Sequence, residues 1–145
     1  MSEEMVLSAG VARVDITPPL GFRMQGIVRR TVGANGVESP LSATVLVLAD
    51  TATKVVIFDC DLLGFDLPLA AEIRATVAER LGTESHCIVI GCTHTHNGPC
   101  TIRHVLGGPH DIGCPVVQRE AQEAYIAHLI GQLSDASALA DDRRQ

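Results

Sequence analysis

Apolar and polar residues alternate along the first part of the chain, and this pattern predicts strands. In residues 11–16, small and branched apolar side chains alternate with Arg13 and Asp15, which is the period of two that a half-buried strand shows. Residues 43–49 and 54–59 are two more runs rich in β-branched side chains. The short polar connection between these two runs predicts a hairpin of antiparallel strands.

The period changes to that of a helix in residues 66–82. Asp66 can accept hydrogen bonds from the backbone of the first turn as an N-cap, and Pro68 suits that turn. Gly82 then marks the end of the helix. Between these signals, apolar residues recur at spacings of three and four and would form one stripe along the helix: Ala70, Ile73, Val77 and Leu81.

The order of these elements predicts the fold class. Residues 87–92 form a short apolar run, so that strand, helix and strand follow one another within residues 54–92. A crossover helix of this kind makes its two strands parallel and the connection right-handed. A second helix is predicted for residues 117–133, with a polar tail from Ser134 that we expect to fray. We therefore predict one α/β domain over residues 1–145, in which a β-hairpin feeds a β-α-β unit of a mixed sheet and helices pack on the sheet.

Residues suited to chemistry gather at the ends of the two predicted parallel strands. Asp59 and Asp61 follow the first of these strands, and His94 and His96 follow the second. The carboxyl ends of parallel strands lie at one edge of the sheet, where ligands bind in open α/β sheets. For the two aspartates, capping of a strand end or anchoring of a loop is as good an explanation as a direct role.

The clearest chemical signal is the segment Thr93-His94-Thr95-His96-Asn97-Gly98-Pro99. In an extended chain, His94 and His96 point to the same side. They could then share a metal ion, or one could bind a metal while the other transfers protons. Thr93 and Thr95 would point the other way and hold neighbouring loops by hydrogen bonds. The alternative is that two histidines end a strand by chance, since this spacing also occurs in unrelated proteins.

The other histidines give weaker signals, and a structural role is the interpretation we favour for each. His104 and His110 lie in the irregular segment 100–117, from which they could approach the site. His86 is expected to begin a strand, and His128 is expected on the surface of the second helix.

The cysteines point to a reducing compartment. There are five of them, an odd number, and they form no pair at C-x-x-C spacing, which argues against a disulfide framework or a zinc ribbon. Reduced thiols fit a cytoplasmic protein. Cys92 and Cys100 flank the histidine pair, which leaves a cysteine–histidine zinc site open, although a small buried thiol is the interpretation we favour for Cys92.

Charge and hydropathy exclude several classes of partner. The net charge is −6 and Lys54 is the only lysine, so nucleic-acid binding is not expected, and the pair Arg29-Arg30 is expected to be solvated surface. Residues 1–10 contain early acidic residues and no basic region, which does not fit a secretory signal. No apolar run reaches the roughly 20 residues that cross a bilayer, so no integral membrane segment is predicted.

Three motifs, in this order along residues 9–99, resemble the N-terminal domain of neutral/alkaline non-lysosomal ceramidases. Residues 9–21 read AGVARVDITPPLG, and residues 61–64 read DLLG. The Thr-His-Thr-His-Asn-Gly-Pro segment is similar to the signature of the family, which usually has serine where this chain has Asn97.

This resemblance implies a zinc-dependent amidohydrolase that cleaves an N-acyl amide, a small molecule or a lipid such as ceramide, to a fatty acid and an amine. It makes His94 a Zn²⁺ ligand and places His96, the catalytic residue, near the substrate and the reacting water. The other ligands of the family, a second histidine, a glutamate and a tyrosine, lie far downstream, and Tyr125 is in the wrong region to replace the last. We therefore expect an N-terminal portion of a longer hydrolase domain, inactive alone. The further site candidates are Asp61, Thr93 and Asn97.

Two alternatives from other classes stay open. One is a non-catalytic α/β domain that binds a partner or forms a homo-oligomer through apolar sheet surface left exposed. The other is a small metal-binding protein that uses His94, His96, His104 and the cysteines.

Overall fold

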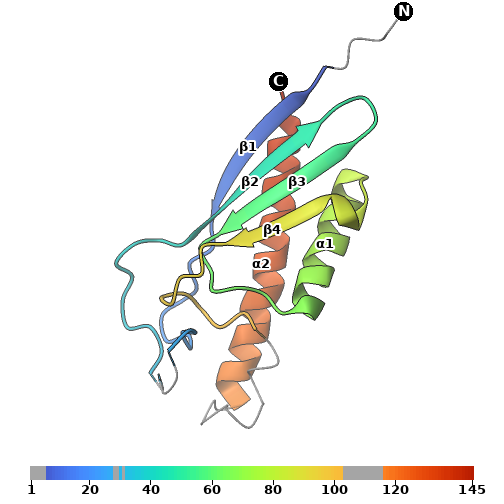
Figure 1. Ribbon diagram of the computed structural model, residues 1–145. Helices are drawn as coiled ribbons and strands as arrows, with labels where there is room; N and C mark the ends of the chain where they lie inside the picture. Colours follow the sequence, from blue (N-terminus) through green and yellow to red (C-terminus); the bar gives the residue numbers. More distant parts are fainter. Residues whose placement is uncertain (1–5, 28–29, 31, 103–115) are drawn as a thin grey trace, which may run out of the picture.

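The described residues form a four-stranded mixed sheet in the order β1-β2-β3-β4 (Figure 1). The computed structural model describes residues 6–27, 30, 32–102 and 116–145. Its strands are β1 (Ser8–Asp15), β2 (Ser42–Ala49), β3 (Lys54–Cys60) and β4 (Ile88–Cys92). Neighbouring strands are antiparallel from β1 to β3, and β4 is parallel to β3. The predicted hairpin and the predicted β-α-β unit are therefore both confirmed.

The helix α1 (Leu67–Leu81) connects β3 to β4 and has the termini that the sequence predicts. The side chain of Asp66 accepts a hydrogen bond of 2.9 Å from the backbone N–H of Leu69. At the other end Gly82 adopts a left-handed conformation with φ 63°, which L side chains rarely adopt. A short 3₁₀ helix, Ser85–Cys87, precedes β4. His86 lies in this turn, so the prediction that it begins a strand is wrong.

The second helix, α2 (Val116–Asp142), is longer than predicted. The tail from Ser134 does not fray, because it packs against the sheet. Ser137 and Ala140 are fully buried, and the Ser137 hydroxyl donates a 2.7 Å hydrogen bond to the carbonyl oxygen of Ser134. A serine satisfied within its own helix can be buried without leaving a polar group unpaired.

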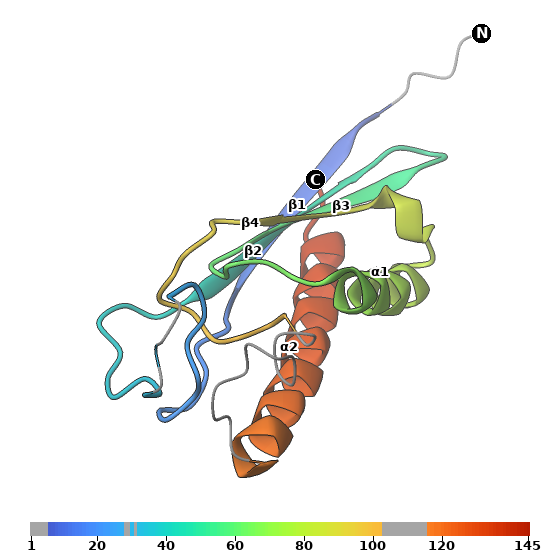
Figure 2. The same ribbon diagram turned by 60° about the horizontal axis from the view of Figure 1, so that its bottom comes forward.

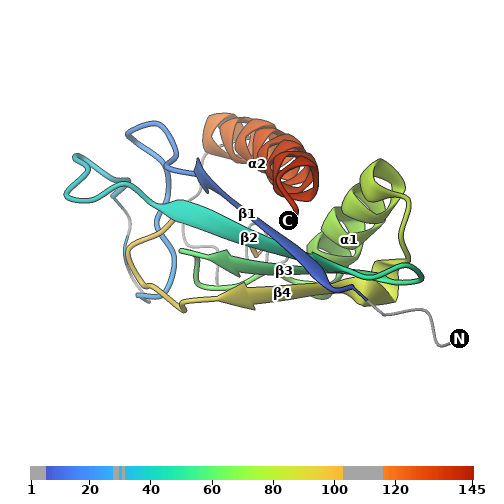
Figure 3. The same cartoon turned by 90° about the horizontal axis from the view of Figure 1, so that it is seen from above.

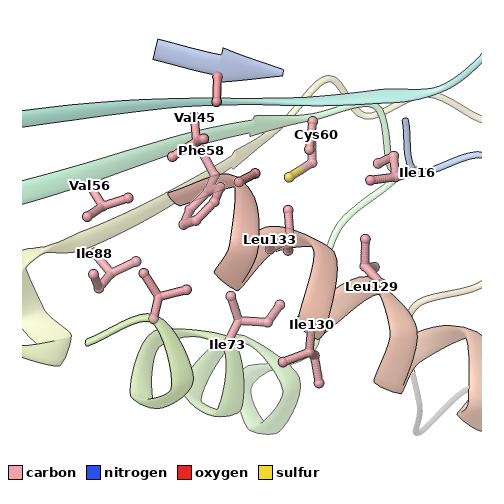
Figure 4. Close-up of a cluster of buried hydrophobic side chains, with 14 of the residues drawn as sticks. Ile16, Val45, Val56, Phe58, Cys60, Ile73, Ile88, Leu129, Ile130 and Leu133 are labelled. Carbon is pink, nitrogen blue, oxygen red and sulfur yellow. The ribbon is translucent and has the colours of Figure 1, made fainter. Parts of the chain in front are cut away.

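Both α1 and α2 lie on one face of the sheet, as Figure 2 and Figure 3 show. The core fills the space between the two helices and the sheet, with Phe58 from β3 opposite Ile73 of α1 and Leu133 of α2 (Figure 4). The opposite face of the sheet carries apolar side chains that remain accessible. On that face Val11 is 52% exposed and Val89 is 49% exposed.

Polar contacts fasten the last residues of the chain to the sheet. The backbones of Ala9 and Gln145 exchange two hydrogen bonds, of 3.1 and 3.2 Å. Asp141 accepts a hydrogen bond of 2.7 Å from Lys54 and one of 2.6 Å from Arg144. Partial burial alone would raise the pKa of Asp141, but the hydrogen bonds and charges of Lys54 and Arg144 hold it below its ordinary value. Among the described residues, no helix is long and apolar enough to cross a membrane.

Candidate functional site

The histidine motif begins where β4 ends, beside the end of β3. The backbone N–H of Thr93 donates to the carbonyl oxygen of Cys60 at 3.0 Å, and that of His94 donates to Leu62 at 3.0 Å. His94 has a positive φ of 61°, so the segment is not extended as the sequence analysis assumed. The two imidazoles nevertheless lie together, with ring centroids 5.2 Å apart and an interplanar angle of 66° between His94 and His96.

The ring of His94 is oriented as that of a metal-binding histidine is. Its Nδ1 lies 2.9 Å from the backbone carbonyl oxygen of Leu63. A carbonyl oxygen can only accept, so Nδ1 carries the proton and the lone pair is on Nε2. Metal-ligating histidines are commonly held in this way, with one ring N–H donated to a carbonyl or carboxylate. His94 is an exposed residue.

The backbone of His96 is fixed by a residue that was expected to be solvated surface. Arg30 donates a hydrogen bond of 2.8 Å from Nη1 to the carbonyl oxygen of His96. This hydrogen bond is exposed, so the surface position predicted for Arg30 is not contradicted, and its guanidinium contacts the motif in addition. Arg29, the other member of the pair, lies outside the described residues.

A short backbone ladder joins the segment before β2 to the end of the motif. Met24 and Pro99 form an isolated antiparallel bridge. The N–H of Gln25 donates to the carbonyl oxygen of Gly98 at 3.0 Å. The N–H of Cys100 donates to the carbonyl oxygen of Arg23, also at 3.0 Å. Part of the segment between β1 and β2 is thus fixed against the histidine motif.

The three further candidates differ in what they contact. The carboxylate of Asp61 accepts hydrogen bonds from the backbone N–H and the hydroxyl of Ser42, at 3.0 and 2.9 Å. These bonds support the loop-anchoring interpretation of Asp61. Thr93 and Asn97 are exposed. Asn97 donates its backbone N–H to the hydroxyl of Thr95 at 3.2 Å, so Thr95 shapes the turn of the motif itself, whereas it was predicted to hold a neighbouring loop.

A groove of about 700 Å³ lies beside the motif. Its walls come from the segment between β1 and β2 and, in the motif, from Thr95, Asn97, Gly98 and Pro99, whereas neither histidine lines it. The lining includes apolar side chains and two charged ones, Arg30 and Glu38. The apolar side chains include Leu20, Phe22, Met24, Val37 and Leu41.

The cysteines at the ends of β3 and β4 are free thiols, of which Cys60 is buried and Cys92 is partly buried. Cys60 and Cys92 are partners in the register of β3 and β4. Burial raises the pKa of Cys60 to about 12, with a smaller contribution from the nearby Cys92. Burial likewise raises the pKa of Cys92 to about 11. Without a metal ion, such thiols stay protonated at neutral pH.

Tyr125 and His128 lie on α2, and His86 lies in the turn before β4. Tyr125 is 5% exposed, and its hydroxyl donates to the carbonyl oxygen of Ile16. Burial raises its pKa above the ordinary value, so it is a core residue. His86 and His128 are exposed. The predictions for residues 103–115, which include His104 and His110, fall outside the described part of the chain.

The described residues do not contain a complete metal site. Within residues 6–27, 30, 32–102 and 116–145, no three His, Cys, Asp or Glu side chains are grouped so that they could hold a metal ion. Sequence reasoning identified His94 and His96 but missed Gly26 and Arg30, which contact His96. Nothing distinguishes Gly26 from the other glycines of its segment, and an arginine pair in an irregular region usually indicates exposed surface.

Comparison with known proteins shows a likeness in fold. The sequence matches no model of a protein family, and no curated protein matches it. The neutral ceramidase of Pseudomonas aeruginosa superposes with a TM-score of 0.72 over 99% of this chain, at 18% sequence identity. A ceramidase described as complexed with C2 gives a TM-score of 0.71 over 98%, at 16% identity. The chain spans 22% of the length of each of these proteins, so it has the fold of one part of a neutral ceramidase.

Proposed function

We propose that this chain is the N-terminal part of a zinc-dependent amidohydrolase that cleaves an N-acyl amide of the ceramide class. One observation carries the proposal. His94, at the carboxyl edge of a ceramidase-like sheet, has Nδ1 fixed to a backbone carbonyl at 2.9 Å and is 5.2 Å, ring to ring, from His96. An exposed imidazole that is held through Nδ1 and lies beside a second imidazole suits one zinc ligand and one proton-transfer group.

The fit to zinc is partial. His94 suits a single ligand, whereas a catalytic zinc takes three protein ligands. The described residues do not supply that set, so the others would come from elsewhere in the complete hydrolase. Zinc in such a site polarises a carbonyl and lowers the pKa of a bound water.

The residues of this chain then have separate tasks. His94 would hold the metal through Nε2. His96, which is exposed, holds or transfers a proton beside it. The apolar walls of the groove next to Asn97 suit an acyl chain, since apolar surface buried on binding favours association. These assignments together favour a lipid amide over a small polar one.

The test begins with the genomic reading frame past Gln145, and an immediate stop there would contradict the proposal. Where the frame continues, this chain is compared with the longer polypeptide. Both are purified, and zinc content and hydrolysis of a fluorogenic N-acyl sphingosine are measured. We expect the longer polypeptide to bind zinc and to hydrolyse the substrate, and the 145-residue chain to do so poorly or not at all. Robust turnover by the metal-loaded short chain, abolished by His94→Ala, would show that the site is complete without further ligands. A zinc-free, inactive longer polypeptide would refute the proposal.

The open face of the sheet favours a second candidate, a non-catalytic domain that self-associates. Val11, Ile57 and Val89 are 52%, 36% and 49% exposed on that face, and contiguous apolar surface often marks an interface. Sedimentation of the chain and of Val89→Lys separates the candidates. A dimer that the substitution dissociates, without any zinc binding, would favour self-association.

A further inference from the structure

One glycine, Gly26, lies directly against the side chain of His96. Gly26 adopts a left-handed conformation with φ 101°, and the ring of His96 occupies the space that a side chain at this position would need. A methyl group on Gly26 would lie 2.5 Å from Cγ, 2.8 Å from Cβ and 2.9 Å from Nδ1 of His96. Distances under 3.0 Å do not occur between such atoms, so the ring or the backbone would have to move.

The backbone on either side of this contact is held in place. The bridge between Met24 and Pro99 and the bond from Gln25 to Gly98 fix the segment that carries Gly26 to the motif that carries His96. Arg30 holds the same histidine by its carbonyl oxygen at 2.8 Å. The imidazole of His96 therefore lies against backbone that is held in place by hydrogen bonds. The backbone carbonyl oxygen of His96 accepts a hydrogen bond from the guanidinium of Arg30.

We propose that Gly26 and Arg30 are positioning residues that together set the direction of the His96 imidazole. Gly26 faces the Cβ–Cγ–Nδ1 side of the ring, so Nε2 is the nitrogen directed away from the backbone. Arg30 holds the main chain from which the ring projects. The inference rests on the proposed function only for the role of His96 as a proton-transfer group. The orientation itself is measurable without any turnover.

The chain offers a matched control for the glycine. Gly21 also has a positive φ, of 89°, but a methyl group there would meet no atom within 4 Å. Gly21→Ala therefore carries the cost of a left-handed alanine alone, and Gly26→Ala carries the same cost plus the collision with His96. Gly36→Ala, with open space and no positive φ, controls for the substitution itself.

The primary measurement is the histidine ¹H–¹⁵N long-range NMR spectrum of the full 145-residue chain, recorded at one fixed pH. We expect Gly26→Ala to shift the ring resonances of His96, while Gly21→Ala and Gly36→Ala leave them unchanged. In the longer enzyme, Gly26→Ala should lower kcat by about 10²-fold, the cost of a misplacement near 1 Å. Zinc content and KM should change little. A His96 spectrum that is the same in Gly26→Ala and in Gly21→Ala would overturn the proposal.

Arg30 provides a second measurement if Gly26→Ala does not fold. Arg30→Met removes the donor to the His96 carbonyl, and Arg30→Lys retains a donor. We expect Arg30→Met to shift and broaden the His96 ring signals and Arg30→Lys to restore them at least in part. Unchanged His96 signals in Arg30→Met would refute the role of Arg30. If Gly26→Ala is unfolded and Arg30→Met leaves the His96 signals unchanged, the proposal as a whole is overturned.

Discussion

Two regions of the molecule are held together in different ways. The first is the sheet with its two packed helices, and the second is the loop region at the carboxyl edge of the sheet. In the first, apolar side chains such as Phe58 and Leu133 are at most 1% exposed between the sheet, α1 and α2. In the second, backbone hydrogen bonds join segments distant in the chain, as between Gly21 and Ala34 at 2.7 Å or Gln25 and Gly98 at 3.0 Å. Burial of apolar surface dominates stability, whereas a few polar contacts fix geometry. Changes in the first region should therefore reduce stability, and changes in the second should alter chemistry.

The largest effects that this comparison predicts are at the two histidines, which should not be equivalent. In the complete enzyme, His94→Ala should remove zinc and activity together, because loss of one of a few ligands weakens metal binding directly. His96→Ala should keep zinc and lower the rate by roughly 10²–10⁴-fold if it transfers a proton. Metal analysis beside kinetics on the two variants measures both effects.

The same two variants of the 145-residue chain show whether the site is separate from the core. Both side chains are exposed, so each substitution should change the free energy of unfolding by no more than about 1 kcal/mol, the worth of one hydrogen bond. Equal zinc loss in both variants would instead mean that both histidines are ligands. A large loss of stability in either would show that the two regions are not independent.

The next prediction concerns adjacent residues of β3 that face opposite ways. Phe58 is 1% exposed against the helices, and Ile57 is 36% exposed on the open face. Phe58→Ala should lower the free energy of unfolding by about 3–5 kcal/mol, because it removes buried apolar surface and leaves a cavity. Ile57→Ala should cost much less, since its side chain already contacts water. Urea denaturation of both variants decides the point, and similar losses would mean that the open face is covered in solution.

The sequence predicts the packed region well because its signals are local. The alternation in β1 to β3, the stripe of α1 and its Asp66 and Gly82 termini all follow from the spacing of neighbouring residues. The end of α2 is the exception. In the sequence that tail appears polar, because it contains serines and few large apolar residues. The structure nevertheless buries Ser134, Ala136 and Ser137, because small side chains allow the helix to approach the sheet closely.

The candidate site is predicted only in part, because its geometry depends on contacts between distant segments. The histidine pair and its position at the sheet edge follow from the motif and the β-α-β order. The positive φ of His94 does not, since a residue other than glycine rarely adopts it. The contacts of Gly26 and Arg30 with His96 likewise have no local signature, because about seventy residues separate the partners.

The smallest predicted effect lies in the packed region and depends on pH. Lys54 and Arg144 hold the pKa of Asp141 below its ordinary value of 3.8, so its carboxylate stabilises the fold above that pH. This stabilisation is lost as the pH falls through the lower pKa of the folded state. Asp141→Asn should therefore cost less than about 1 kcal/mol at pH 7, as partly exposed ion pairs do, and the difference from the wild type should shrink below pH 3.8. Unfolding curves of both proteins at several pH values measure it, with the exposed neighbour Asp142→Asn as the control. A difference that does not change with pH would mean that Asp141 acts through hydrogen bonds that asparagine cannot replace, and that its charge contributes nothing.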